Sequence, residues 1–494
     1  MDRYLLAIDQ GTTSSRAILF DAGGRVLDVQ QKELTLHYPH KGWVEQDAND
    51  IWNDTLWCVR GIVAALGADA SKIAALGVTN QRETTILWDR KTGVPVYNAI
   101  VWQDRRTAEF CATLKQAGCE GPITDKTGLL LDPYFSASKI AWILDNVEGA
   151  RARAEAGDLA FGTVDSYVLW KLTGGRVHAS DVTNAARTML YNIVAQQWDE
   201  DLLRLFNIPA AILPQVKDNV ADFGVTDAGV IGAAIPIGGM AGDQQAALIG
   251  QACFDHGMVK ATYGTGCFAL MTIGADFKPS QNRLLTTPAY CLNGAVTYAL
   301  EGSIFTAGAA VQWLRDNLGL FDDAAQSDAL ARSVPDNNGV YFVPAFTGLG
   351  APYWRPDARG MICGLSRESA KAHIVRAALE AQAYQTLDLM GAMEGDSGLK
   401  VAQIRADGGL MANDFVGQFL ADMLDRDIAV PDVLETTAWG AACLAGLSAG
   451  VFGDLNDIAQ QYRQARLFQP QMAAQDRAAL YQGWRDSVQC LLRD

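Results

Sequence analysis

The chain has 494 residues, of which 49% are hydrophobic and 19% charged, and its formal net charge is −16 at pH 7. This length exceeds what one compact core accommodates, and the composition is typical of globular rather than disordered proteins. The acidic balance argues against nucleic acid or an anionic membrane as the main partner. We therefore expect a globular protein of about two to four domains that binds neither.

The nine cysteines contain no Cys-x-x-Cys pair, and there are only five scattered histidines. This usage favours reduced thiols over a zinc site or a disulfide framework. Asp9 interrupts the first apolar run, so no signal peptide is indicated. The Gly/Ala-rich stretch 229–242 contains Pro236 and is too short to span a bilayer. We expect a cytoplasmic protein without membrane insertion.

Two apolar runs within residues 6–20 flank the tip Gly11-Thr-Thr-Ser-Ser15, a pattern that predicts a β-hairpin with a small polar turn. Such a turn can present backbone N–H groups and hydroxyls to phosphate oxygens, and Asp9 is placed to hold a hydrated Mg²⁺. An ordinary hairpin with a polar turn is the alternative. The candidate phosphate ligands are Thr12, Thr13, Ser14 and Arg16.

The next part of the chain predicts a helix at about 48–66 and a buried strand at 73–79. The strand ends at the polar segment Asn80-Gln-Arg-Glu83. Polar residues at the carboxyl end of a core strand are where α/β proteins place their ligands. Arg82 and Glu83 are therefore candidate ligand-binding residues, although an adjacent cation and anion can equally form a surface ion pair.

Further strands are expected at 86–89 and at a segment that ends with 100–106, followed by a helix within 134–146. Trp102 lies in the second of these strands and is either a core residue or a wall against which a small carbon skeleton packs. After a helix that starts near residue 165, we expect a long irregular region that continues to Pro236.

A Gly-rich strand then leads to Asp243 and Gln244 at the start of an Ala-rich helix. The default role of an acid in this position is a helix cap. Its place just before a second Gly-Thr turn, Gly264-Thr265-Gly266, makes a catalytic base the stronger hypothesis. That turn lies between two apolar runs about half the chain after the first, which predicts duplicated domains at 1–250 and 251–494 with a nucleotide in the cleft between them.

The second domain is expected to supply the adenosine side of this cleft. A helix at 306–315 begins with small residues, which would let a flat ring lie close to its backbone. The segment 404–413 predicts a strand, a Gly-Gly turn and a helix, and 435–446 predicts a tightly packed helix of small residues. The candidate cofactor ligands in this half are Thr265, Gly308, Gln312, Gly409 and Asn413.

Five blocks in this order resemble the FGGY family of carbohydrate kinases over essentially the whole chain: the two phosphate hairpins, Asp407-Gly-Gly with Asn413, and two signature segments, 134–146 and 360–380. The resemblance implies an α/β fold of two duplicated actin-like, ribonuclease H-like ATPase domains. It also implies that ATP and Mg²⁺ bind in the interdomain cleft, near Asp9 and Asp243, and that a terminal hydroxyl is phosphorylated.

The expected substrate pocket is similar to that of family members that phosphorylate glycerol, whereas relatives that use ketopentoses carry a Gly-Gln-Met-His type of segment where Gln81-Arg-Glu83 stands. A neutral triol needs directional hydrogen bonds and apolar walls. We expect Asp243 to accept the hydroxyl proton, giving sn-glycerol 3-phosphate. The candidate substrate-binding residues are Arg82, Glu83, Trp102, Tyr134, Asp243, Gln244 and Phe268.

The loop 228–234 lacks the basic residues of relatives that fructose 1,6-bisphosphate inhibits, so we expect no such inhibition here. A homo-oligomer, either a dimer or a tetramer, is expected.

The alternative functions are a kinase for another polyol or sugar and, in a different class, an actin-like or Hsp70-like ATPase that acts on a protein partner. A catalytically silent regulator would lack an acid, but Asp9 and Asp243 are both present.

Overall fold

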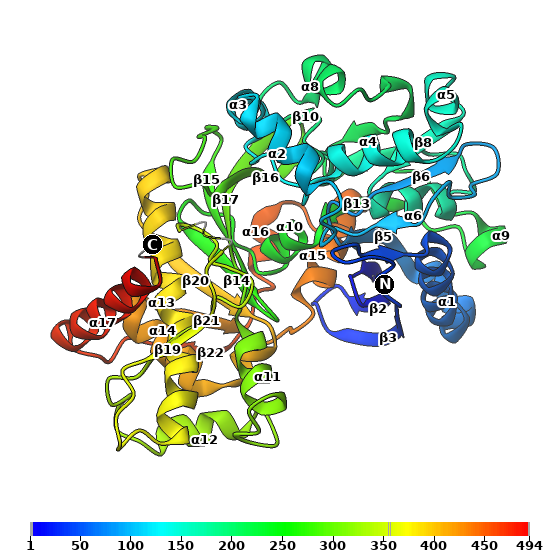
Figure 1. Ribbon diagram of the computed structural model, residues 1–494. Coiled ribbons are helices and arrows are strands. Elements are labelled where there is room, and N and C mark those ends of the chain that lie inside the picture. The colour runs from blue at the N-terminus through cyan, green and yellow to red at the C-terminus, as the bar shows by residue number, and fades with distance from the viewer. Residues whose placement is uncertain (1–2, 354, 356, 493–494) are drawn as a thin grey trace.

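The computed structural model describes residues 3–353, 355 and 357–492, and its longest strands form two separate sheets, one in each half of the chain (Figure 1). The five-stranded sheet has the order β13-β5-β1-β2-β3. Its strands are β1 (Tyr4–Gln10), β2 (Ser14–Asp21), β3 (Val26–Glu33), β5 (Ile73–Asn80) and β13 (Ile237–Gly242).

The seven-stranded sheet has the order β16-β17-β15-β14-β20-β21-β22 and is built from the second half alone. Its strands are β14 (Met258–Tyr263), β15 (Cys267–Gly274), β16 (Leu285–Leu292), β17 (Ala295–Ile304), β20 (Gln403–Asp407), β21 (Ile428–Pro431) and β22 (Gln464–Phe468).

The two sheets share one topology. β1 pairs antiparallel with β2 and parallel with β5, and β14 pairs in the same way with β15 and β20. β3 and β17 each extend the antiparallel side, and β13 and β21 each extend the parallel side. The strand orders 3-2-1-5-13 and 17-15-14-20-21 are therefore equivalent, which confirms the expected duplicated α/β fold.

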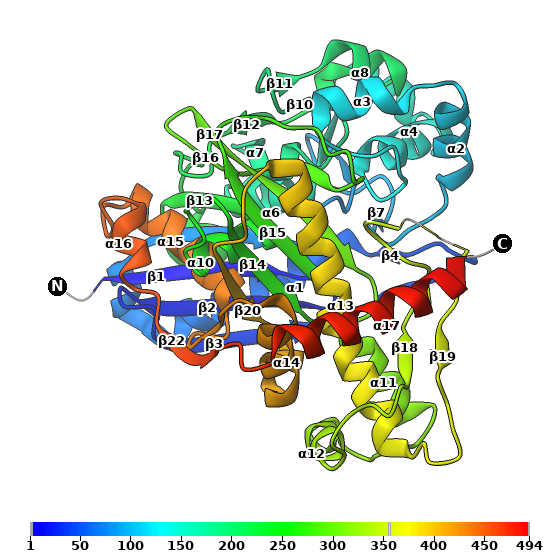
Figure 2. The same cartoon turned by 90° about the vertical axis from the view of Figure 1, so that its left-hand side faces the viewer.

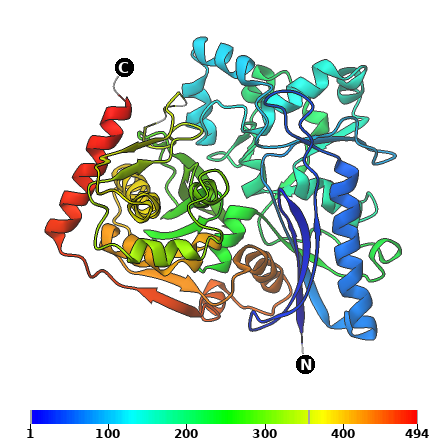
Figure 3. The same ribbon diagram turned by 60° about the horizontal axis from the view of Figure 1, so that its bottom comes forward.

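The helix predicted at 48–66 is α1 (Ala48–Leu66), which covers one face of the five-stranded sheet (Figure 3). The Asp47 side chain accepts a hydrogen bond from Asn49 N–H at its start, and Gly67, with φ 55°, ends it. Ile51, Val59 and other apolar residues on one face are buried against the strands. The local sequence therefore fixes both ends and the buried face of this helix.

The prediction of one long irregular region up to Pro236 was wrong. The region holds short elements, and three of its brief helices begin at an aspartate, Asp181, Asp199 or Asp227, whose side chain accepts hydrogen bonds from the first backbone N–H groups. The helix expected near residue 165 is α6 (Val164–Leu172), and the elements that follow it are β9 (Ala179–Asp181), α7 (Val182–Ala185), β10 (Tyr191–Asn192), β11 (Gln197–Trp198), α8 (Glu200–Leu205), η2 (Ala210–Ile212), β12 (Gln215–Lys217) and α9 (Ala228–Ile231).

The first half of the chain contains further helices and strands. They are β4 (Glu45–Gln46), η1 (Gly67–Lys72), β6 (Ile86–Asp89), β7 (Ala99–Ile100), α2 (Ala108–Gln116), α3 (Glu120–Thr127), α4 (Ser136–Asn146), α5 (Ala150–Glu155), β8 (Leu159–Gly162) and α10 (Asp243–Gly250).

Helix α13 (Lys371–Ser397) is the longest element of the second half, and α17 (Ala474–Leu492) crosses it (Figure 2). Tyr481 and Trp484 of α17 both donate to the buried carboxylate of Asp388 on α13. The other elements here are α11 (Gly308–Asp316), α12 (Gln326–Arg332), β18 (Tyr341–Val343), β19 (Met361–Cys363), η3 (Gly409–Ala412), α14 (Asp414–Leu424), α15 (Thr436–Ser448) and α16 (Leu455–Ala459).

Helix α15 joins the two halves. It belongs to the second half but packs against α10 and against β1, β5 and β13 of the first sheet. A Cβ added to Gly440 would lie 1.7 Å from the Ala246 carbonyl oxygen, and one added to Gly77 would lie 2.0 Å from that of Ala441. The expected tight packing of this small-residue helix is confirmed, with backbones in direct contact.

No helix among the described residues is long and apolar enough to cross a membrane.

Candidate active site

The first hairpin turn connects β1 to β2, and the Gly11 N–H donates to the Ser14 carbonyl at 2.9 Å. Asp9 and Arg16 face each other across the two strands and form an ion pair. Arg16 also pairs with Glu435 at 2.5 Å. Burial raises the pKa of the Asp9 carboxyl, and Arg16 opposes that rise. Thr13 is exposed, whereas Thr12 and Ser14 are half-buried.

The second turn, Gly264–Gly266, is closed by a hydrogen bond of 2.9 Å from Gly264 N–H to the Gly266 carbonyl. The start of α11 packs directly on it, because Gly308 N–H donates to the Gly264 carbonyl at 2.9 Å. The turn at Gly408 packs on the end of β14, the strand that leads into the second turn. A Cβ added to Gly408 would lie 2.4 Å from the Tyr263 carbonyl oxygen. Both segments predicted for the adenosine side therefore meet at this turn.

The predicted nucleotide ligands of the second half lie around this junction. Thr265, Gln312 and Gly409 are exposed. Asn413 is half-buried, and both ends of its amide are engaged within the protein: its oxygen accepts from Val416 N–H at 3.1 Å, and its nitrogen donates to Ser327 at 3.0 Å. Asn413 therefore caps α14, which limits the hydrogen bonds it can offer to a ligand.

Three aromatic side chains predicted for the substrate pocket come together from different parts of the chain. The ring centroids of Trp102 and Tyr134 are 5.6 Å apart, and those of Trp102 and Phe268 are 6.5 Å apart, both with edge-on geometry. Trp102 Nε1 also donates to the Thr12 hydroxyl at 2.9 Å. Trp102 thus connects the first hairpin turn to Phe268, which follows the second turn.

Arg82 and Glu83 are not a surface pair, since they are only 3% and 1% exposed. Arg82 Nε lies 3.1 Å from Asp243 Oδ1. The Glu83 carboxylate is bound instead by Arg187 Nε at 2.5 Å, and Glu83 has the strained backbone angle φ 61°. The segment after β5 is therefore an interior cluster of charges and not a solvated loop.

Asp243 is the first residue of α10, and its side chain is 30% exposed. Its Oδ1 accepts from Gln244 N–H at 2.7 Å, while the described residues provide no partner for Oδ2. Burial raises the pKa of the Asp243 carboxyl; Arg82 and Lys260 lower it, and Asp9 raises it further. The arrangement leaves one carboxylate oxygen available to a ligand.

The two acids suit a magnesium ion that is held mainly by phosphates and water. No cluster of three or more metal-ligating side chains exists among the described residues, so a cage made entirely of protein ligands is absent from that part of the chain. Mg²⁺ in kinases typically uses one or two carboxylates. Asp9 and Asp243 both have raised pKa values, which a nearby cation would relieve, so these residues fit the ion.

Sequence reasoning missed three charged residues of this site: Arg187, Lys260 and Glu301. Glu301 binds both Arg82 and Arg187, and Lys260 donates to the side chain of Gln244. All three are at most 1% exposed. Two of them could have been found from the sequence, because Lys260 in β14 and Glu301 in β17 are each a single charge within a largely apolar strand. A charge buried in this way requires a partner of opposite charge or a hydrogen bond.

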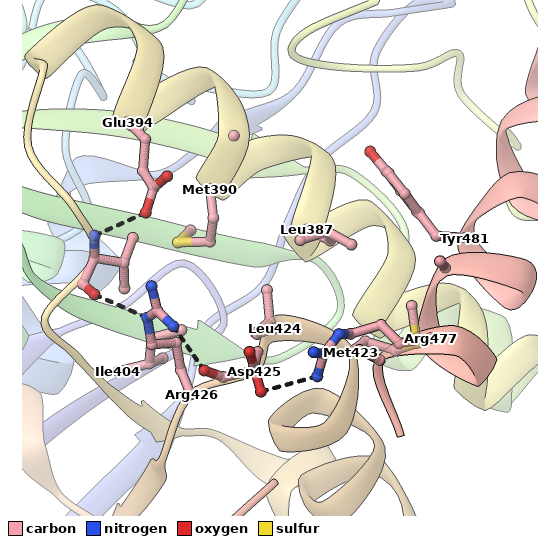
Figure 4. Close-up of a pocket in the computed structure, with 14 residues that line it drawn as sticks. Leu387, Met390, Glu394, Ile404, Met423, Leu424, Asp425, Arg426, Arg477 and Tyr481 are labelled. Carbon is pink, nitrogen blue, oxygen red and sulfur yellow. Dashed lines mark hydrogen bonds and ion pairs between the residues drawn. The ribbon is translucent and has the colours of Figure 1, made fainter. Parts of the chain in front are cut away.

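A separate cavity of about 430 Å³ lies between α13, α14 and α17, away from these residues (Figure 4). Arg477 on its wall pairs with Asp425 at 2.9 Å, and Arg426 donates to the Val401 carbonyl at 3.1 Å. The cations of this cavity are thus engaged by neighbouring groups, and none of the predicted site residues lines it.

Two family models match the chain in order. The model of the N-terminal domain of the FGGY family of carbohydrate kinases matches residues 4–250, and that of the C-terminal domain matches residues 259–449. The glycerol kinase of Nitrosomonas eutropha is 65% identical over 99% of this chain and 98% of its own length. That of Rhodospirillum centenum is 58% identical over 98% and 97%.

Solved structures of other kinases are similar to this chain over almost its whole length. The glycerol kinase of Plasmodium falciparum, determined with ADP, is similar with a TM-score of 0.95 at 36% identity, covering 100% of this chain and 99% of that one. The xylulose kinase of Rhodospirillum rubrum has a TM-score of 0.88 at 24% identity, covers 99% of each chain, and supports the fold alone. The protein therefore belongs to the FGGY family of carbohydrate kinases.

Proposed function

We propose that this protein transfers the terminal phosphoryl group of ATP to a terminal hydroxyl of glycerol, giving sn-glycerol 3-phosphate for glycerol catabolism. The observation that carries the proposal is the Arg82–Asp243 pair, at 3.1 Å, in a site whose other walls are the rings of Trp102, Tyr134 and Phe268. Directional polar groups beside apolar walls suit a small neutral triol. The relatives named glycerol kinase support the same substrate.

In this proposal, Asp243 Oδ2 accepts the proton of the attacking hydroxyl while Oδ1 stays on Arg82. Arg82, Glu83 and Gln244 fix the other hydroxyls, and the aromatic rings hold the carbon chain. Phosphoryl transfer is mostly positioning and charge neutralisation, so no protein nucleophile is needed. Closing the cleft around both substrates would exclude water and limit ATP hydrolysis.

The nucleotide is proposed to lie between the two turns. The first turn would contribute Thr12, Thr13 and Ser14, with Arg16 nearby, and the second turn would contribute Thr265. Gly308, Gln312, Gly409 and Asn413 would line the adenosine side. Asp9 and Asp243 would hold Mg²⁺, which when bound neutralises charge on the phosphate oxygens.

A coupled assay with Mg-ATP and a panel of glycerol, dihydroxyacetone, erythritol and xylulose tests the substrate. We expect kcat/KM to be highest for glycerol. A higher value for another member of the panel would replace glycerol as the substrate and leave the kinase assignment intact.

An actin-like or Hsp70-like ATPase is the alternative of another class. The same assay tests it, because such a protein would hydrolyse ATP at a rate that no polyol changes. A polyol-dependent rate favours the kinase, and the cluster of Trp102, Tyr134 and Phe268 together with the Arg82–Asp243 pair supports that outcome.

We also propose a cytoplasmic location, a division into two domains and a homo-oligomeric state. The free state of all nine cysteines supports a cytoplasmic location. The division into domains 1–250 and 251–494 is supported by the origin of the two sheets. A homo-oligomer, dimeric or tetrameric, would be tested by sedimentation equilibrium of the purified protein.

A further inference from the structure

A buried carboxylate from the second half of the chain holds the arginine of the proposed glycerol site. Glu301 lies on β17, in the seven-stranded sheet, and its side chain is 0% exposed. It accepts two hydrogen bonds from Arg82, from Nη1 at 2.6 Å and from Nη2 at 2.9 Å. A bidentate pair of this kind fixes the plane of the guanidinium as well as its position.

The same carboxylate binds a second buried arginine. Arg187 donates to Glu301 at 3.2 and 3.3 Å, and its Nε donates to Glu83 at 2.5 Å. Acids and arginines therefore alternate in the order Asp243, Arg82, Glu301, Arg187 and Glu83, with Glu301 in the centre. Although burial alone would raise it, Arg187 and Arg82 lower the pKa of Glu301 to about 2. The two arginines thus favour the ionised form of Glu301.

A second buried charged residue of the second half also binds a residue of the proposed glycerol site. Lys260 lies on β14 of the seven-stranded sheet, is 0% exposed, and donates to the side-chain oxygen of Gln244 on α10. Arg82 and Gln244, both proposed to bind the substrate, come from the first half, and each is held by a charged residue of the second.

We propose that Glu301 and Lys260 are positioning residues that complete the glycerol site from the opposite lobe. Glu301 sets the orientation of Arg82, and through Arg82 that of Asp243, while Lys260 sets the orientation of Gln244. This inference rests on the proposed function. It adds that glycerol binds well only when the second lobe presents these two side chains to the first.

The test is Glu301→Gln, which keeps the size of the side chain and removes its charge. We expect the glycerol KM to rise about tenfold or more while the ATP KM stays within about twofold. Isothermal titration with glycerol should show the same loss of affinity without turnover. Glu380→Gln is the matched control, because Glu380 is another buried carboxylate, 1% exposed and bound by Arg376 at 2.7 Å.

Equal glycerol KM values in Glu301→Gln and the wild type would overturn the role of Glu301, as would equal changes in Glu301→Gln and Glu380→Gln. If Glu301→Gln does not fold, the same kinetic measurements on Lys260→Met test the proposal. A raised glycerol KM with an unchanged ATP KM supports the proposal, and a raised ATP KM alone overturns it by placing Lys260 on the nucleotide. A wild-type protein without glycerol-dependent turnover would instead refute the proposed function itself.

Discussion

The indole N–H of Trp102 donates to the Thr12 hydroxyl at 2.9 Å, so the apolar wall of the proposed substrate pocket is bonded to the turn that is proposed to bind phosphate. One side chain therefore touches both proposed binding regions, since its ring also packs against Tyr134 and Phe268. A change at Trp102 should affect both substrates.

Trp102→Phe keeps an aromatic wall and removes this hydrogen bond. We expect kcat/KM to fall by about fivefold for glycerol and for ATP alike, the value of one ordinary hydrogen bond. Steady-state kinetics in both substrates measures this. Trp57→Phe on α1 is the control, because Trp57 is 51% exposed and lies outside the site. A loss confined to glycerol would show that the bond does not support the turn.

Asp243→Asn removes the proposed base and should lower kcat by about 10²- to 10⁴-fold, while ATP binding measured by titration persists. The wild-type rate should fall as the pH drops through the Asp243 pKa, which burial raises above its ordinary value, because only the ionised form accepts the proton. Near-normal turnover of Asp243→Asn would remove Asp243 from this role.

Arg82→Ala should raise the glycerol KM by about 10- to 100-fold, since charge-assisted hydrogen bonds are lost. The melting temperature should also fall, because Glu301 then loses its ion pair with Arg82 and retains the longer one with Arg187. Kinetics and thermal unfolding of the same preparation separate the two effects. An unchanged glycerol KM would show that Arg82 does not contact the substrate.

Gly308→Ala should raise the ATP KM and leave glycerol binding unchanged. The added Cβ would lie 2.6 Å from the Gly264 oxygen, so either α11 or the second turn must move. Gly391→Ala on α13 is the matched control, because a Cβ there meets nothing within 4 Å. That control should be as active as the wild type and slightly more stable. Equal ATP KM values in both variants would contradict the proposed nucleotide site.

Lys139 should make stability depend on pH. Burial lowers its pKa from 10.5 to about 8 in the folded protein, where its ammonium donates to the Tyr134 and Phe135 carbonyls. At a pH between these two pKa values, Lys139 is more fully protonated in the unfolded chain than in the folded protein. The free energy of unfolding therefore rises with pH across that range. Lys139→Met should lose this rise, as seen in melting temperatures at about pH 7.5 and 9.5. An identical pH dependence in both proteins would refute the assignment.

Local patterns were enough to predict much of the fold. The two Gly-Thr hairpins, α1 and the Asp407-Gly-Gly turn each depend on neighbouring residues, whose spacing and turn chemistry are visible in the sequence. The duplication followed from the repeated turn alone. The brief capped helices before Pro236 were missed because α7 and α9 have only four residues each, about one helical turn, and an apolar period must repeat over several turns to be recognised.

The charge partners of the site could not be predicted in this way. Arg82 and Glu301 are 219 residues apart in the sequence, and only the fold brings them together. The sequence indicated that Arg82 was either a ligand or a surface residue, but which carboxylate would hold it depends on how the two sheets face each other. Lys260 and Arg187 were missed for the same reason.

Helices α10 and α15, from opposite halves of the chain, are in direct backbone contact. Although each sheet comes from one half, the face of the first sheet is covered by a helix that follows residue 435. A fragment that ends at residue 250 would expose the apolar strands under α15, and the complementary fragment would expose Trp439 and its neighbours. We therefore expect neither lobe to be soluble when expressed alone, because each would expose the apolar surface that the other now covers.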